Sequence, residues 1–295
     1  MNRVVVVLIA AASAQAIISS PAAAEEVILG VLEHPQCKKE PLSAVRVLFR
    51  ERGQEWLALN SEESSREISL ADISWTVAFD GKRLGSIKTV DPGFSSPYPW
   101  TYPRDRLLVL APDQPVPSIA NRQEHFGGWC DAPANRPLVV ISRPNSEDPQ
   151  RWKRFTPDPT VRNQVFSHFA GAAGKANTCE SEDLENPSLW RYSADDLVFS
   201  GSYQDRAGRT LVGLRLDPAR NQCDGPRDDA WATHWFIVED SIRLLGVNLT
   251  LIDAGDYDAD GTAEVLFWYS GYNKDGYSLF YDGLRKRVDY LWSYH

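Results

Sequence analysis

Apolar and polar residues alternate in short runs along most of the chain, and turn-forming residues separate these runs. Residues 27–34, VILGVLEH, alternate, and residues 44–59, AVRVLFRERGQEWLAL, have the pattern of a hairpin that turns near Gly53. Residues 73–90 place Asp80-Gly81 between two β-rich flanks, which is a strong local hairpin signal. The N-terminal part of the chain therefore predicts antiparallel strands joined by tight turns.

Strand patterns also fill the second half, with a single helical interruption. Strands or hairpins are expected at 196–217, 231–240, 242–253, 264–272 and 276–295. Residues 160–177 instead have apolar side chains at helical spacing and end in small residues and Gly174. We therefore expect an all-β fold with a minor helix, either propeller-like or built from irregular antiparallel sheets that Pro-rich loops join.

Residues 144–159 are polar and rich in proline, which is typical of a domain boundary or a long surface loop. Two organisations agree with this pattern. Residues 25–295 form a single propeller-like β domain, or residues 25–143 and 160–295 form two separate β domains.

The stretch LIDAGDYDADGTAEVLFWYS, at 251–270, has the residue types and spacing of a calcium-binding loop. Carboxylates at alternate positions of a tight turn converge on one point, and Ca²⁺ takes six to eight oxygen ligands. The expected ligands are Asp256, Asp258, Asp260, the Thr262 carbonyl and Glu264. An EF-hand is excluded, because its twelfth position would be Phe267 rather than Glu. The alternative is an acidic β-turn without a metal.

The residues GDYDADGTAEVLFW, which begin at Gly255, resemble the calcium loop of FG-GAP and VCBS-type repeats. These repeats are the blades of integrin-α-like β-propellers, in which the loop lies between two strands. The resemblance covers about twenty residues of the chain, and it implies a bound Ca²⁺ and a propeller. Two features depart from the family pattern: Glu264 stands where Asp is commoner, and the loop occurs once.

The first 24 residues have the features of a signal peptide. Arg3 is the positive n-region, residues 4–18 are a short apolar region, and alanines at 22–24 supply a small-residue cleavage site. The apolar run is too short for a confident transmembrane span, although a retained N-terminal anchor is the alternative. We expect a periplasmic or secreted protein with no membrane span after cleavage.

The cysteine content agrees with an oxidising destination. Cys37, Cys130, Cys179 and Cys223 form no C-x-x-C motif, and two disulfides are the natural interpretation. Three pairings are open, and we favour Cys37–Cys130 with Cys179–Cys223, which keeps each pair within one half of the chain.

Charge and motifs restrict the function. The formal net charge of -9 makes the chain a poor binder of nucleic acid or anionic membranes. The sequence contains no G-x-S-x-G, H-E-x-x-H, P-loop or G-x-G-x-x-G motif. We therefore expect a non-enzymatic binding module with a structural Ca²⁺. The alternative is a periplasmic or secreted hydrolase of polysaccharide or cell-envelope substrates.

Aromatic residues suggest where such a module would hold a ligand. Trp100 and Tyr102 lie in a Pro-rich loop, and Tyr272 and Tyr277 lie in an aromatic-rich C-terminus. If exposed, these four side chains form a platform for a carbohydrate or protein ligand. The alternative is that they cap a sheet edge or fill the core.

Overall fold

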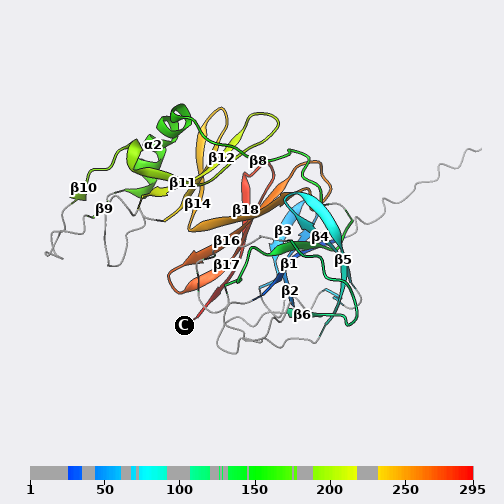
Figure 1. Cartoon of the computed structure of the whole chain (residues 1–295). Coiled ribbons are helices and arrows are strands. Elements are labelled where there is room, and N and C mark those ends of the chain that lie inside the picture. Colours follow the sequence, from blue (N-terminus) through cyan, green and yellow to red (C-terminus); the bar gives the residue numbers. More distant parts are fainter. Residues whose placement is uncertain are drawn as a thin grey trace, which may run out of the picture.

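The computed structural model describes residues 26–34, 44–60, 68–70, 73–91, 107–119, 126, 128, 132–144, 146–174, 176–177, 189–217 and 232–294 (Figure 1). The expected signal peptide at 1–24, the four cysteines, Trp100 and Tyr102 lie outside these residues. The expectations of export and of two disulfides therefore stay predictions.

The N-terminal half forms a seven-stranded antiparallel sheet of which six strands close into a barrel. Its strands are β1 (Val27–Glu33), β2 (Ala44–Arg52), β3 (Glu55–Ala58), β4 (Ser74–Phe79), β5 (Lys82–Val90), β6 (Leu107–Leu110) and β7 (Leu138–Ile141). The order is β1-β7-β4-β5-β6-β2-β3, and pairing of β1 with β2 closes the barrel. Asp80 and Gly81 both have positive φ, 50° and 64°, which confirms the predicted hairpin between β4 and β5.

The second half contains two further antiparallel sheets, of five and four strands. The five-stranded sheet has the order β14-β13-β12-β11-β8, and the four-stranded sheet is the meander β15-β16-β17-β18. Their bounds are β8 (Lys153–Arg154), β11 (Leu197–Gln204), β12 (Thr210–Leu216), β13 (His234–Val238), β14 (Ile242–Val247), β15 (Leu249–Gly255), β16 (Glu264–Gly271), β17 (Lys274–Tyr281) and β18 (Lys286–Ser293). A short pair, β9 (Ala176–Asn177) and β10 (Leu189–Trp190), and a 3-10 turn η1 (Ala194–Asp196) complete the strand-rich part.

The predicted helix is confirmed as α2 (Pro159–Ala173). The Asp158 carboxylate accepts a hydrogen bond from the Val161 N–H and caps the first turn, where Pro159 has no N–H to satisfy. Gly174, with φ of 68°, ends the helix. Among the described residues, no helix is both long and apolar enough to cross a membrane.

The all-β class is confirmed, but the described part of the chain contains no propeller. The chain adopts the other predicted architecture, antiparallel sheets of unequal size. The physical reason is visible in the first sheet: β1 pairs with both β7 and β2, so the sheet closes on itself and cannot serve as an open blade.

The sheets and the helix are stacked, so that most strands bury both faces. On β16, Leu266 and Trp268 face the barrel, and Val265 and Phe267 face the five-stranded sheet. On β12, Leu211 faces the four-stranded sheet, and its neighbour Val212 faces α2. Strand alternation therefore supplies three successive apolar interfaces.

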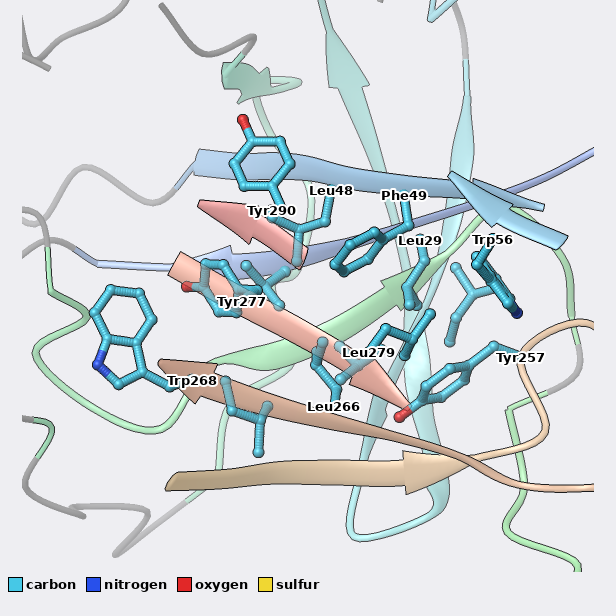
Figure 2. Packing of buried hydrophobic residues seen from close by; sticks show 14 of the residues in the cluster. Leu29, Leu48, Phe49, Trp56, Tyr257, Leu266, Trp268, Tyr277, Leu279 and Tyr290 are labelled. Atoms are coloured by element: carbon cyan, nitrogen blue, oxygen red, sulfur yellow. The ribbon is translucent and has the colours of Figure 1, made fainter. Parts of the chain in front are cut away.

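The largest apolar cluster lies between the barrel and the four-stranded sheet (Figure 2). It contains Val27, Leu29, Val31, Leu48, Phe49, Val139 and Ile141 from the barrel, and Leu266, Trp268, Tyr277, Leu279, Tyr290 and Trp292 from the sheet. Segments from both sides of residues 144–159 thus share one core. Burial of this much aromatic and aliphatic surface stabilises the arrangement of the two halves.

A buried ion pair lies within this interface. The Arg46 Nε donates to the Glu33 Oε1 at 2.7 Å, and both side chains are almost fully buried. The Tyr277 hydroxyl donates to the other oxygen of Glu33, and the Arg46 guanidinium lies over the Trp292 ring, 4.5 Å from its centroid. The carboxylate of a barrel strand is therefore held by the barrel and by the four-stranded sheet at once.

We expect Glu33→Ala to lower the free energy of unfolding by about 3–5 kcal/mol, because it leaves the Arg46 guanidinium buried without its carboxylate. Tyr277→Phe removes only a hydroxyl and should cost about 1–3 kcal/mol. Urea denaturation measures both changes. Glu55→Gln is the control, because Glu55 bonds Tyr281 and Lys286 at the exposed end of the same interface. If the urea midpoint of Tyr277→Phe matched that of wild type, as the midpoint of the Glu55→Gln control should, the role assigned to the Tyr277 hydroxyl would be contradicted.

Candidate metal centre

The acidic loop connects two paired strands of the four-stranded sheet. Gly255 ends β15 and lies opposite Glu264, the first residue of β16. Between them, Asp256, Asp258 and Asp260 each offer a carboxylate oxygen, and these oxygens all lie within 4.8 Å of one another. The structure therefore brings together three of the five ligands expected from the sequence, in a group that could hold a metal ion.

Backbone amides shape the loop by donating to the same carboxylates. The Gly261 N–H donates to Asp256 Oδ2 at 3.1 Å, and the Asp260 N–H donates to Asp258 Oδ1 at 3.1 Å. The Ala259 and Gly261 φ angles of 66° and 88° bend the chain sharply between the ligands.

One carboxylate oxygen of the loop has no hydrogen-bond donor among the described residues, and a cation could take that place. Asp256 Oδ1 is buried and has no hydrogen-bond partner within the described residues. A buried, charged oxygen without a partner is costly. A cation between the three aspartates would satisfy this oxygen, so the donor set passes a test of fit for a metal ion.

The other two expected ligands lie differently. Glu264 is only 1% exposed and does not belong to the group of three; its Oε2 accepts a hydrogen bond from the Tyr257 N–H at 2.7 Å. The Thr262 N–H donates to Asp260 Oδ1 at 2.6 Å. For Thr262 and Glu264, metal coordination stays a prediction.

The electrostatics of the loop disfavour charge when no metal is present. Burial, together with the nearby Asp260 and Asp256 carboxylates, raises the pKa of Asp258 to about 6. Burial also raises the pKa of Asp256, with a contribution from Asp260. The pKa of Glu264 lies well above its ordinary value, first because of burial and then because of Asp258. A divalent cation would reverse this effect by favouring the ionised forms.

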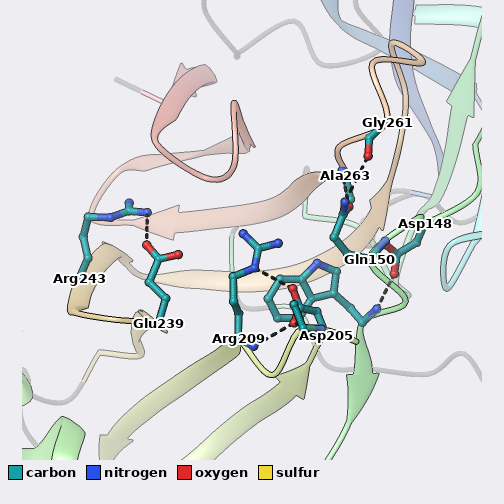
Figure 3. Close-up of polar contacts among 10 residues, drawn as sticks. Asp148, Gln150, Asp205, Arg209, Glu239, Arg243, Gly261 and Ala263 are labelled. Atoms are coloured by element: carbon teal, nitrogen blue, oxygen red, sulfur yellow. Dashed lines mark hydrogen bonds and ion pairs between the residues drawn. The ribbon is translucent and has the colours of Figure 1, made fainter.

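The loop is anchored by a segment more than a hundred residues earlier (Figure 3). The Gln150 side chain accepts from the Ala263 N–H at 2.5 Å and donates to the Gly261 carbonyl at 3.3 Å. The Asp256 N–H donates to the Glu147 carbonyl at 3.1 Å. Sequence reasoning missed Gln150, because it lies in the polar stretch interpreted as a boundary and belongs to no motif.

The structure separates the aromatic residues proposed as a platform. Tyr272 is fully exposed in the turn after β16. Tyr277 is fully buried in the core and donates to Glu33, so it cannot contact an external ligand. Trp100 and Tyr102 lie outside the described residues, and their role stays a prediction.

Comparisons of the chain with profiles of protein families, with curated proteins and with solved structures gave no match. The metal centre is therefore interpreted from its own geometry and chemistry.

The raised pKa of Asp258 predicts how the metal-free protein responds to pH. The folded state holds a proton up to about pH 6, whereas an unfolded Asp releases it near pH 3.9. The folded state binds more protons in this window, so stability in EDTA should fall as pH rises from about 4 to 6.

Asp258→Asn tests this effect, because it keeps an oxygen for the Asp260 N–H and carries no charge. At neutral pH in EDTA, we expect its melting temperature to exceed that of wild type by roughly 2–4 °C. The gain is modest because solvent screens a half-buried carboxylate. Glu239→Gln, in the turn between β13 and β14 of the five-stranded sheet, is the control. A lower melting temperature for Asp258→Asn in EDTA would contradict the assigned repulsion.

Proposed function

We propose that the protein is an exported, calcium-binding β protein that acts as a binding or interaction module. Ca²⁺ holds the loop between β15 and β16 and has a structural role. The observation that carries this proposal is the convergence of the Asp256, Asp258 and Asp260 carboxylates, with one buried oxygen of Asp256 lacking a partner.

The chemistry of the donors favours Ca²⁺ over other ions. All three side chains are carboxylates, the hard oxygen ligands that Ca²⁺ prefers, and no His or Cys among the described residues joins them. Mg²⁺ demands near-ideal octahedral geometry and releases water reluctantly, which suits a short irregular loop less well. The resemblance of this loop to FG-GAP and VCBS-type repeats supports the same ion, although the described residues form no propeller.

Export agrees with such a site. A signal peptide at 1–24 would deliver the chain to the periplasm or outside the cell, where two disulfides would form. Calcium sites of extracellular modules typically bind with dissociation constants of about 10⁻⁴–10⁻³ M. A structural ion of this affinity would stabilise the protein only after export.

The ion would act on more than its own loop. It would neutralise three carboxylates and remove the repulsion between them. Because the Gln150 side chain bonds Gly261 and Ala263, an ordered loop would also hold the segment around residues 147–152.

The competing hypothesis, a hydrolase, gains less support. A glycosidase-like reaction needs one carboxyl group that donates a proton and a second that acts as a base or nucleophile, both beside the substrate. Asp148 and Asp253 are two carboxylates that line the same cavity. Each oxygen of Asp148 accepts a hydrogen bond from a backbone N–H, that of Gln150 at 2.9 Å and that of Trp152 at 2.6 Å. Asp253 Oδ1 accepts a hydrogen bond from the Gly81 N–H at 3.1 Å. These carboxylates are thus engaged in holding the backbone, which favours a binding role.

Thermal unfolding in Ca²⁺, Mg²⁺ and EDTA tests the proposal. At a Ca²⁺ concentration about 100-fold above the dissociation constant, binding adds about 2.7 kcal/mol, so we expect a melting temperature at least about 5 °C higher than in EDTA. Equimolar Mg²⁺ should produce little of this shift.

Asp258→Ala should remove most of the difference between Ca²⁺ and EDTA, since it deletes one of three charged ligands. Asp282→Ala is the matched control, because Asp282 lies in another turn of the same sheet, between β17 and β18. If the difference in melting temperature between Ca²⁺ and EDTA were the same in Asp258→Ala as in wild type, the assignment of the ion to this loop would be wrong.

A further inference from the structure

A cavity of about 550 Å³ lies where the three sheets meet, beside the segment that anchors the acidic loop. Its lining comes from the β4–β5 turn and Arg136 of the barrel half, from residues 148–154, and from strands β11 and β15. This volume lies within the range of small-molecule sites, and cavities between structural units are common places for such sites.

The charge of the cavity is opposite to that of the protein. Five cationic side chains line it, against three carboxylates, on a chain with a formal net charge of -9. The cations are Lys82, Arg136, Arg151, Lys153 and Arg154, and the carboxylates are Asp80, Asp148 and Asp253. A positive concavity on an acidic protein concentrates small anions.

Neighbouring groups already neutralise the buried part of this set. Arg136 forms an ion pair with Asp80 at 2.7 Å and lies 3.8 Å from Asp253. In contrast, the exposed side chains of Lys82, Arg151 and Lys153 have no ion-pair partner among the described residues. Three cations around the cavity therefore remain available to an anion from solution.

The cationic wall is built by a constrained turn. Arg151 has a φ of 57°, a left-handed conformation that a non-glycine residue adopts at a free-energy cost. The Asp148 carboxylate stabilises this turn by accepting hydrogen bonds from the backbone N–H groups of Gln150 and Trp152, the two neighbours of Arg151. Gly81 allows the opposite wall to approach closely, because a Cβ there would lie 2.5 Å from the Asp148 Cβ.

Two aromatic side chains add a second kind of recognition. Trp152 and Tyr203 both line the cavity, and each is half-buried against the apolar cluster between the two C-terminal sheets. Tyr203 stacks on Trp235, with ring centroids 6.3 Å apart, which holds its orientation. The Arg154 guanidinium lies over the Tyr203 ring, 5.5 Å from its centroid, and the Arg209 guanidinium lies over the Trp152 ring at 5.6 Å. A ligand ring in the cavity would contact the parts of these two aromatic side chains that line it.

We propose that this cavity binds a small anionic ligand that carries a ring, such as a sugar bearing a phosphate or carboxylate group. Lys82, Arg151 and Lys153 contact the anionic group, and Trp152 and Tyr203 contact the ring. Phosphate and carboxylate share the chemistry that these cations recognise, and the experiment below distinguishes the two. This inference does not depend on the metal in the acidic loop.

Isothermal titration calorimetry with four probes tests the proposal. Glucosyl phosphate and glucuronate carry a ring and an anion, glucose lacks the anion, and inorganic phosphate lacks the ring. We expect at least one of the first two to bind with a micromolar to millimolar dissociation constant that weakens as salt is added. Glucose and inorganic phosphate should bind at least about tenfold more weakly.

A charge-matched pair of double variants locates the site. Arg151→Gln with Lys153→Gln removes two cavity cations and should weaken binding at least about tenfold. Arg83→Gln with Lys88→Gln removes two exposed cations of β5 that do not line the cavity, and should leave affinity within about twofold.

Three results would overturn the proposal. One is the absence of binding of both ring-bearing anions at millimolar concentration. Another is an equal loss of affinity in the two double variants, which would show only a dependence on net charge. The third is binding of inorganic phosphate as tight as that of glucosyl phosphate, which would exclude the aromatic contribution. Binding of glucosyl phosphate alone, or of glucuronate alone, identifies the anionic group.

Discussion

The contact of Glu33 with Arg46 and Tyr277 joins the two halves of this protein at the centre of their shared core. Burial and dispersion favour contact between the barrel and the four-stranded sheet, but they add no directional bond that specifies one relative orientation. A buried carboxylate that must reach both Arg46 and the Tyr277 hydroxyl allows few alternative registers. Breaking it leaves a desolvated guanidinium without this carboxylate.

That contact has consequences along the four-stranded sheet. Tyr277 fixes β17 against the barrel, and β17 pairs with β16 along its whole length. The next pairing, of β16 with β15, ends at Gly255 and Glu264, where the acidic loop begins. The loop therefore sits on a rigid support, which explains how three carboxylates stay close despite their mutual repulsion. The Gln150 side chain, from the other side, connects the loop to the wall of the central cavity.

Local features of this fold were predictable from the sequence, because they depend on a few adjacent residues. Asp80-Gly81 indicated a hairpin, Gly174 indicated a helix end, and the spacing of Asp256, Asp258 and Asp260 indicated a cluster of carboxylates. The strand predicted at 264–272 is confirmed as β16.

Features that depend on distant pairings were not predictable. Closure of the barrel requires Val27 to pair with Glu51, and no local pattern specifies that register. When a strand is buried on both faces, as β16 is, apolar residues occupy both faces, so its sequence does not indicate which neighbouring sheet packs against each face. For Tyr277, both an exposed platform and the core stayed open from the sequence, because aromatic alternation does not reveal which face is solvated. Gln150 and Arg151 were overlooked for a similar reason: their roles arise only when the polar segment folds back onto the acidic loop and the cavity.

The most direct test of the account is the metal content of the purified protein. In equilibrium dialysis against Ca²⁺ at a concentration above the expected dissociation constant, the mature chain should hold one Ca²⁺ per molecule in excess of the outer solution, measured by elemental analysis. The variant with Asp256→Asn, Asp258→Asn and Asp260→Asn should carry none while it keeps its β-sheet circular dichroism. An empty wild-type protein, or a bound Ca²⁺ that survives all three substitutions, would contradict the account.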